Sequence, residues 1–264
     1  MYVRASAPRT IGGVLDDAIS LYRNSYASVW PFTLAAAVVV AMPGAFLGLQ
    51  LAHARTLGPQ AILAMMKAPS YWLTYALIVV FHVAIYGALL SALNSFIERG
   101  QASLGAAFAT GLSVLPRMLA VSVLFGLMVA IGLFVLIVPG IYLSGIYQLA
   151  VVVLIVERAG VSESFGSSRR LIRGYWWRSA AIITVAIIIV FVFSLIGGMV
   201  NGLAVGLFGF GTSFALLDQA IVGIVLNAFL LPLLPCFLLA MYYDLKLRHE
   251  GGDLAAGVDA LAAR

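Results

Sequence analysis

The sequence predicts an all-α membrane protein, a polytopic helical bundle of about six transmembrane helices in three hairpins, with amphipathic interfacial elbow helices. Three observations predict this fold class. The composition is 63% hydrophobic and only 9% charged, about a third of the charge of an ordinary soluble domain. The apolar residues are grouped into long stretches with almost no charge, and the basic residues gather in alternate segments between those stretches. We therefore expect the whole chain, 1–264, to form a single integral membrane domain.

Three stretches fit one crossing each. A helix needs about 20 apolar residues to cross the hydrocarbon core, because its backbone must satisfy its own hydrogen bonds there. Crossings are predicted at 29–52, 71–96 and 216–243, and Asp218 is the one Asp, Glu, Lys or Arg among them. At ~1.5 Å per residue the helix from Asp218 to Asp244 reaches ~39 Å, so Asp218 can lie in the outer headgroup layer.

The uncharged stretch 118–156 is too long for one helix. Pro139-Gly140 divides it, since proline removes a hydrogen-bond donor and glycine permits a tight turn. This pattern predicts a short hairpin with crossings at 117–138 and 141–157. The fifth crossing is predicted at 179–201, followed by a glycine-rich outer loop that runs to Ser213.

Amphipathic segments precede the odd-numbered crossings, and we expect each to form an elbow helix in the headgroup plane. The elbows are predicted at 10–27, 103–116 and 161–177. The apolar stripe of the third comprises Val161, Phe165, Ser168, Ile172 and Trp176. Elbow and hairpin together suggest a unit that occurs three times. The alternative is that any cytoplasmic loop between membrane helices tends to be amphipathic.

The basic residues predict the orientation, because Lys and Arg concentrate in cytoplasmic segments. Six crossings leave only Arg55 and Lys67, of 15 basic residues, on the outer side. The other thirteen are Arg4, Arg9, Arg23, Arg99, Arg117, Arg158, Arg169, Arg170, Arg173, Arg178, Lys246, Arg248 and Arg264. Both ends, including a tail at 244–264, are therefore expected in the cytoplasm, with the protein in a bacterial inner membrane. The first apolar run begins near Val29, which predicts no cleaved signal.

Three segments resemble a known family. They are Val138-Pro139-Gly140-Ile141-Tyr142, the elbow from Glu163 to Trp177 with Ser168-Arg169-Arg170 inside it, and Tyr242-Tyr243-Asp244-Leu245-Lys246-Leu247-Arg248-His249-Glu250-Gly251. They look like the family named after the membrane domain of glycerophosphoryl diester phosphodiesterases, over nearly the whole chain. The resemblance implies a six-helix bundle, often a stand-alone protein and only sometimes fused to a phosphodiesterase.

No catalytic machinery is predicted. The catalytic domain of those phosphodiesterases uses a His-Arg-Gly segment and a Glu-x-Asp pair of metal ligands, and this sequence has neither. Cys236 is the only cysteine, so no internal disulfide or cysteine metal cluster can form. We expect no enzyme, no cofactor and no metal site. The expected partners are membrane lipids, including anionic ones, and a membrane protein or a second copy; no nucleic acid is expected.

Basic residues at the inner rim are the candidates for binding lipid headgroups. Each basic residue near an anionic surface contributes about 1 kcal/mol. The candidates are Arg169, Arg170, Arg173, Arg178, Lys246 and Arg248. The alternative is that they only set the topology, and both roles can hold together.

His82 and Asn227 are the polar candidates inside predicted crossings. An ionisable group in a membrane segment is by default a functional candidate. A neutral imidazole can nevertheless be satisfied by one neighbouring hydroxyl or carbonyl, and Asn227 can bond across helices. The structural role is therefore favoured for both.

Two functions remain open. The first is a non-enzymatic membrane protein that organises lipid or assists another membrane protein. The second is a transporter or channel for a small or lipidic solute, which an internal repeat mildly favours and which requires a polar path through the bundle. An intramembrane enzyme is weakest, because no paired acid and base is available.

Overall fold

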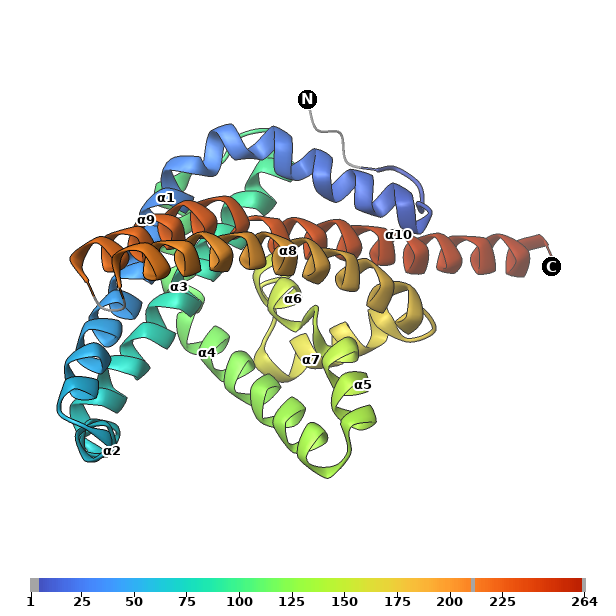
Figure 1. The fold of residues 1–264 in the computed structure, drawn as a ribbon. Coiled ribbons are helices and arrows are strands. Elements are labelled where there is room, and N and C mark those ends of the chain that lie inside the picture. Colours follow the sequence, from blue (N-terminus) through green and yellow to red (C-terminus); the bar gives the residue numbers. More distant parts are fainter. Residues whose placement is uncertain (1–4, 210–211, 263–264) are drawn as a thin grey trace.

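The computed structural model describes residues 5–209 and 212–262, apart from the side chains of 40, 42–49, 51–56, 213, 215, 216, 250 and 252–262. These residues form ten helices and no strand, so the described part of the chain is all-α as predicted. The helices make three successive hairpins, two of which begin with helices that continue from their elbows (Figure 1).

The first hairpin is made by α1 (Ile11–Thr56) and α3 (Pro69–Arg99), with the short α2 (Pro59–Lys67) at its tip. The elbow predicted at 10–27 and the crossing predicted at 29–52 are one unbroken helix, which changes direction along its length (Figure 1). Pro31 and Pro43 lie inside α1, and proline is the usual cause of a helix bend.

The second hairpin is made by α4 (Leu104–Val135) and α5 (Ile137–Tyr147), which α6 (Ala150–Val156) follows. Pro116 lies inside α4, at the predicted boundary between elbow and crossing. The turn comes at Leu136, earlier than the predicted break at Pro139-Gly140. Pro139 instead occupies the first turn of α5, where no backbone donor is needed.

The third hairpin pairs α8 (Trp176–Phe208) with α9 (Ser213–Leu230) and the first part of α10 (Leu233–Ala262). Its elbow is α7 (Val161–Ile172), which is shorter than the predicted 161–177, because the chain turns at Gly174 with φ +86°. The predicted outer loop is also shorter, since α8 continues to Phe208. Glycines inside a membrane helix keep their backbone hydrogen bonds and need not end it.

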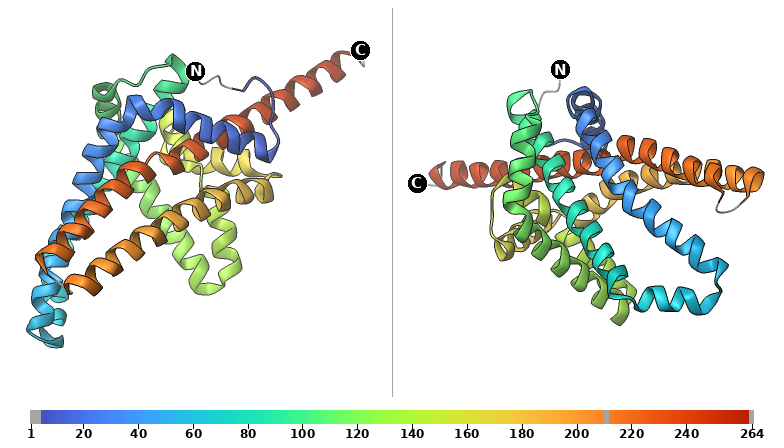
Figure 2. Two further views of the ribbon diagram at one scale, coloured as in Figure 1. Left: turned by 45° about the horizontal axis from the view of Figure 1, so that its top comes forward. Right: turned by 90° about the vertical axis from the view of Figure 1, so that its left-hand side faces the viewer.

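Five segments are long and apolar enough to cross a membrane: α3, α4, α5 with α6, α8, and 217–249 in α9 and α10. They correspond to the second to sixth predicted crossings. The first predicted crossing, 29–52, is helical, but many of its side chains lie outside the described residues. The chain is thus a multi-pass membrane protein. Helix α10 packs against α1 and α8 and continues past them toward the C-terminus (Figure 2).

Part of each apolar stripe of the elbow helices packs on other helices of the protein. Val14, Ala18 and Leu21 of α1 are almost fully buried, and Ala107 and Gly111 of α4 are buried as well. In α7 the ring of Phe165 packs on Tyr147, and the hydroxyl of Ser168 donates to the carbonyl of Ile146 at 2.8 Å. These buried residues therefore join the elbow helices to the rest of the bundle.

Two glycines let α3 and α4 approach closely. A Cβ atom added to Gly111 would lie 2.7 Å from the backbone nitrogen of Ala88, and one added to Gly87 would meet the sulfur of Met118. Small residues at helix interfaces serve this purpose in membranes, where packing drives association.

We predict that Gly111→Ala destabilises the protein by about 1–3 kcal/mol, because the new methyl group meets rigid backbone. Gly126→Ala is the matched control in the same helix, since nothing lies within 4 Å of its added Cβ atom. Equilibrium unfolding in mixed detergent micelles measures both variants. Equal stability of the two would contradict the close approach of α3 and α4.

Candidate functional site

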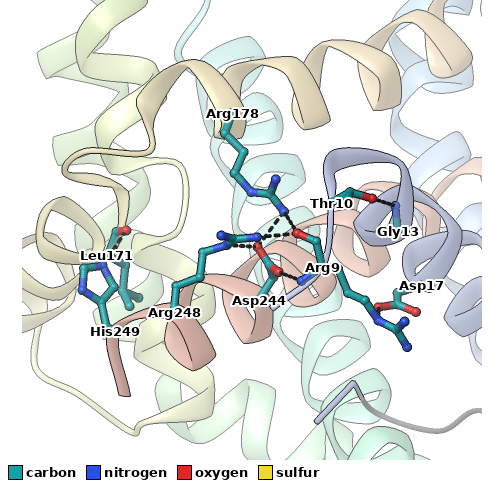
Figure 3. A network of polar contacts seen from close by, with 9 residues as sticks. All are labelled: Arg9, Thr10, Gly13, Asp17, Leu171, Arg178, Asp244, Arg248 and His249. Atoms are coloured by element: carbon teal, nitrogen blue, oxygen red, sulfur yellow. Dashed lines mark hydrogen bonds and ion pairs between the residues drawn. The ribbon is translucent and has the colours of Figure 1, made fainter. Parts of the chain in front are cut away.

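A buried carboxylate, that of Asp244, lies at the centre of a charge cluster (Figure 3). Its Oδ2 accepts hydrogen bonds from Arg178 Nη2 and Arg248 Nε, both at 2.9 Å, and its Oδ1 accepts one from the backbone N–H of Arg9 at 2.7 Å. Both guanidinium groups also donate to the carbonyl of Arg9. The side chain of Asp244 is only 3% exposed, so its charge depends on these partners.

The Arg9 side chain extends the cluster toward α1. Its Nε lies 3.6 Å from Oδ2 of Asp17. Burial raises the pKa of the Asp17 carboxyl, Arg9 opposes this effect, and the nearby Asp16 and Asp244 add to it. The segment before α1 is therefore held by both its backbone and its side chain.

A second network surrounds the two tyrosines that precede Asp244. Tyr242 donates its hydroxyl to Glu157 Oε1 at 2.7 Å, and Lys246 Nζ lies 3.4 Å from the same oxygen. Tyr243 donates its hydroxyl to Asn94 Oδ1 at 2.7 Å. These tyrosines connect α10 to the end of α6 and to the last part of α3.

We name these residues the polar layer: Arg9, Asn94, Glu157, Arg178, Tyr242, Tyr243, Asp244, Lys246 and Arg248. They come from the segment before α1, the start of α8, the last part of α3, the residue after α6 and the middle of α10. Segments that the basic residues assign to one side therefore meet at one end of the bundle. The start of α1 and the tail side of α10 lie on the same side.

The predicted headgroup-binding residues divide into two groups. Arg178, Lys246 and Arg248 are engaged in the ion pairs of the polar layer. Arg169, Arg170 and Arg173 are exposed, and no acidic side chain in the described part of the chain pairs with them. Arg170 donates only to the hydroxyl of Ser167, at 2.8 Å. The first group is thus paired within the protein, and the second remains available to a ligand.

These three arginines lie at the end of α7. Gly160 precedes the helix, and its backbone N–H donates to the carboxylate of Glu163 at 3.2 Å, which stabilises the first turn. Ser164, Ser167 and Ser168 are buried against the protein, and the arginines lie on the opposite, exposed face.

An apolar cavity of about 510 Å³ lies between α4, α5, α6, α8 and α10. Phe125, Ile141, Trp176 and Ile183 are among its lining residues, and Ser144, Gln148 and Thr184 add a few polar groups. The Nε2 atom of Gln148 is buried and has no hydrogen-bond partner in the described structure. A volume and lining of this kind suit a small apolar ligand or one acyl chain.

His82 and Asn227 do not line this cavity. His82 is exposed on the surface of α3, and the side-chain amide of Asn227 donates to the carbonyl of Gly223 in its own helix at 2.8 Å. The structure thus does not bring the two candidates together around a polar path. Asp218 is half-buried in α9, and its Oδ2 makes no hydrogen bond within the described residues.

No protein-family model, curated protein or solved structure matches the chain. The resemblance to the phosphodiesterase membrane domain therefore stays a prediction.

Sequence reasoning missed the central role of Asp244 and the pairs that Asn94 and Glu157 form with tyrosines. The available signal was a set of isolated polar residues near the ends of apolar stretches, including Asn94, Glu157, Arg178 and Asp244. Nothing in their spacing along the chain indicates which of them meet.

We predict that Asp244→Asn lowers the free energy of unfolding by about 3 kcal/mol or more, because it leaves two largely buried guanidinium groups without a counter-charge. Glu157→Gln is the control, since the Glu157–Lys246 pair is about one-third exposed and should contribute below about 1 kcal/mol. Unfolding in mixed micelles measures both. A cost for Asp244→Asn no larger than that of the control would show that the cluster does not hold the fold together.

Proposed function

We propose that this protein is a non-enzymatic membrane protein that binds anionic lipid at its inner rim and so organises lipid or assists another membrane protein. The proposal includes its placement in a bacterial inner membrane with both termini in the cytoplasm, and its membership of the membrane-domain family that it resembles.

The observation that carries the proposal is the unpaired charge on α7. Internal acids pair with the cations of the polar layer, whereas Arg169, Arg170 and Arg173 keep three neighbouring charges exposed. Guanidinium groups bind phosphate oxygens in a bidentate manner, and arginine suits such a site better than lysine does. A cluster of this kind next to membrane helices supports binding of an anionic headgroup.

The apolar cavity supports the same function. It adjoins the C-terminal side of α7 through Trp176, whose indole N–H donates to the carbonyl of Tyr142 at 3.3 Å. A lipid with its headgroup at the arginines would find apolar volume close by for an acyl chain. The buried amide of Gln148 offers a donor to an ester carbonyl.

Transport is the second candidate. The repeated arrangement of hairpins favours it, because many transporters contain internal repeats. The position of His82 on the surface and the internal hydrogen bond of Asn227 weaken it, since neither residue contributes to a polar path.

We predict that reporters fused after Arg264 and within the segment 55–67 lie on opposite sides of the membrane. The hydrogen bond from Arg9 to Asp244 joins residues near the two ends of the chain, which supports an even number of membrane crossings between them. The distribution of basic residues predicts that both ends lie in the cytoplasm. Paired phosphatase and fluorescent-protein fusions measure the two positions. A shared side for both fusions would contradict this topology.

We predict that the triple variant Arg169→Gln, Arg170→Gln, Arg173→Gln retains at least tenfold less phosphatidylglycerol or cardiolipin. Three contacts at about 1 kcal/mol each are lost, before any allowance for screening. Folding should survive, because these side chains have no ion-pair partner in the described structure. Lipid that co-purifies is measured by mass spectrometry, and again in 1 M salt, where the Debye length falls to about 3 Å.

The matched control is Arg23→Gln, Arg99→Gln, Arg117→Gln, which removes the same charge from three exposed positions on α1, α3 and α4. It should lose much less lipid, because these arginines belong to three different helices. Equal losses would show that only net charge matters. Unchanged retention in a correctly inserted α7 variant would leave its arginines as topology signals alone.

A further inference from the structure

The tip of the α4–α5 hairpin, residues 133–138, is entirely apolar and uncovered. Phe134 is 93% exposed and Val138 is 76% exposed. Between Ser122 and Tyr142 no side chain carries a polar group. An aqueous loop would leave all of these large side chains in water, which soluble surfaces avoid.

The hairpin is also short when measured from α7. Ser168, next to the exposed Arg169, donates its hydroxyl to the carbonyl of Ile146 at 2.8 Å, so Ile146 lies at the level of α7. Nine residues separate Ile146 from Ile137, the first residue of α5, which amounts to ~14 Å of helix. The hydrocarbon core is about 30 Å thick, so the tip reaches about half of it.

The length of α4 between the cavity and the tip is consistent with this depth. Phe125 lines the cavity together with Gly145 and Trp176, at the base of the hairpin. From Phe125 to Val135 is again only ~15 Å of helix. The two arms are tightly packed, because a Cβ atom on Gly132 would lie 2.8 Å from the Cα atom of Gly140.

The helix that follows does not lengthen the hairpin. The chain turns after Tyr147, and α6 then runs within the protein, with Val152, Val153 and Leu154 fully buried. Figures 1 and 2 show the α4–α5 hairpin set apart from the other two, without a partner helix at its tip.

We propose that α4 and α5 form a re-entrant hairpin whose tip ends within the hydrocarbon core, in contact with acyl chains, and does not reach the outer surface. It replaces the two crossings predicted at 117–138 and 141–157. Both arms return to the same side, so the distribution of basic residues is the same with either arrangement. Two backbone donors at the turn are bonded within the hairpin, since Leu136 N–H donates to the carbonyl of Gly132 and Gly140 N–H to that of Leu136.

The hairpin would occupy only the leaflet on the side of α7. It therefore acts as a one-sided wedge that displaces acyl chains from a single leaflet. This inference rests on the proposed position of α7 at the headgroups. It does not depend on whether its arginines select anionic lipid, so the lipid-retention experiment and the experiment below can fail separately.

Two leucines provide a matched pair for the test. Leu136 lies at the tip of the α4–α5 hairpin and is 64% exposed, and Leu57 lies at the tip of the α1–α3 hairpin and is 66% exposed. The variants Leu57→Cys and Leu136→Cys are expressed separately. A membrane-impermeant maleimide is then added to intact cells and to inverted vesicles that contain each variant. The wild type measures the background, because Cys236 is fully buried.

We expect Leu57→Cys to be labelled from outside and Leu136→Cys to be labelled at least tenfold less from either face, with full reaction after denaturation. A nitroxide attached at position 136 should collide freely with oxygen and little with a water-soluble nickel chelate. Labelling of Leu136→Cys from outside at the level of Leu57→Cys would overturn the proposal. Shielding of the nitroxide from both reagents would also overturn it, because the tip would then be covered by protein.

The second experiment introduces a charge at the tip and measures how much protein is correctly inserted. Leu136→Lys should reduce correctly inserted protein on the order of 100-fold, because a lysine near the centre of the core is strongly unfavourable. Leu57→Lys should accumulate like the wild type. Equal accumulation of both lysine variants would place the tip in water and overturn the proposal.

Discussion

The buried carboxylate of Asp244 is the constraint on which the arrangement of the helices depends. A carboxylate that is 3% exposed needs a counter-charge, and its three partners come from the segment before α1, the start of α8 and the next turn of α10. Since these partners are far apart in the sequence, one group fixes how the first and third hairpins meet. The tyrosines beside it bring α3 and the end of α6 to the same level.

The polar layer also explains why the charged residues at this end of the bundle differ in their surroundings. Seven of its nine members bond through charged or hydroxyl side chains to other members, and their charges are largely cancelled there. The arginines of α7 are left out, because α7 is joined to the core through serines and a phenylalanine rather than through acids. The proposed headgroup site and the ion pairs that join the helices are thus both built from arginines, in different surroundings.

Packing inside the membrane follows a different rule from packing at the polar layer. Glycines 87 and 111 let α3 and α4 touch, and glycines 132 and 140 do the same for α4 and α5. The first pair joins two hairpins, whereas the second only closes one hairpin on itself. The α4–α5 tip therefore stands alone, and an apolar cavity remains between this hairpin and α8.

The sequence by itself determined the fold class, because hydrophobicity and charge act locally: long apolar stretches must be helices in lipid, and basic residues mark one side. It also identified the arginines of α7 as candidates. Only the tertiary structure decided that Arg178, Lys246 and Arg248 form ion pairs within the protein and that His82 lies on the surface. It also decided that part of each elbow stripe packs on protein and that the second hairpin is short. These features depend on which residues meet across hundreds of positions, as Arg9 and Asp244 do, and no periodicity along the chain encodes such pairs.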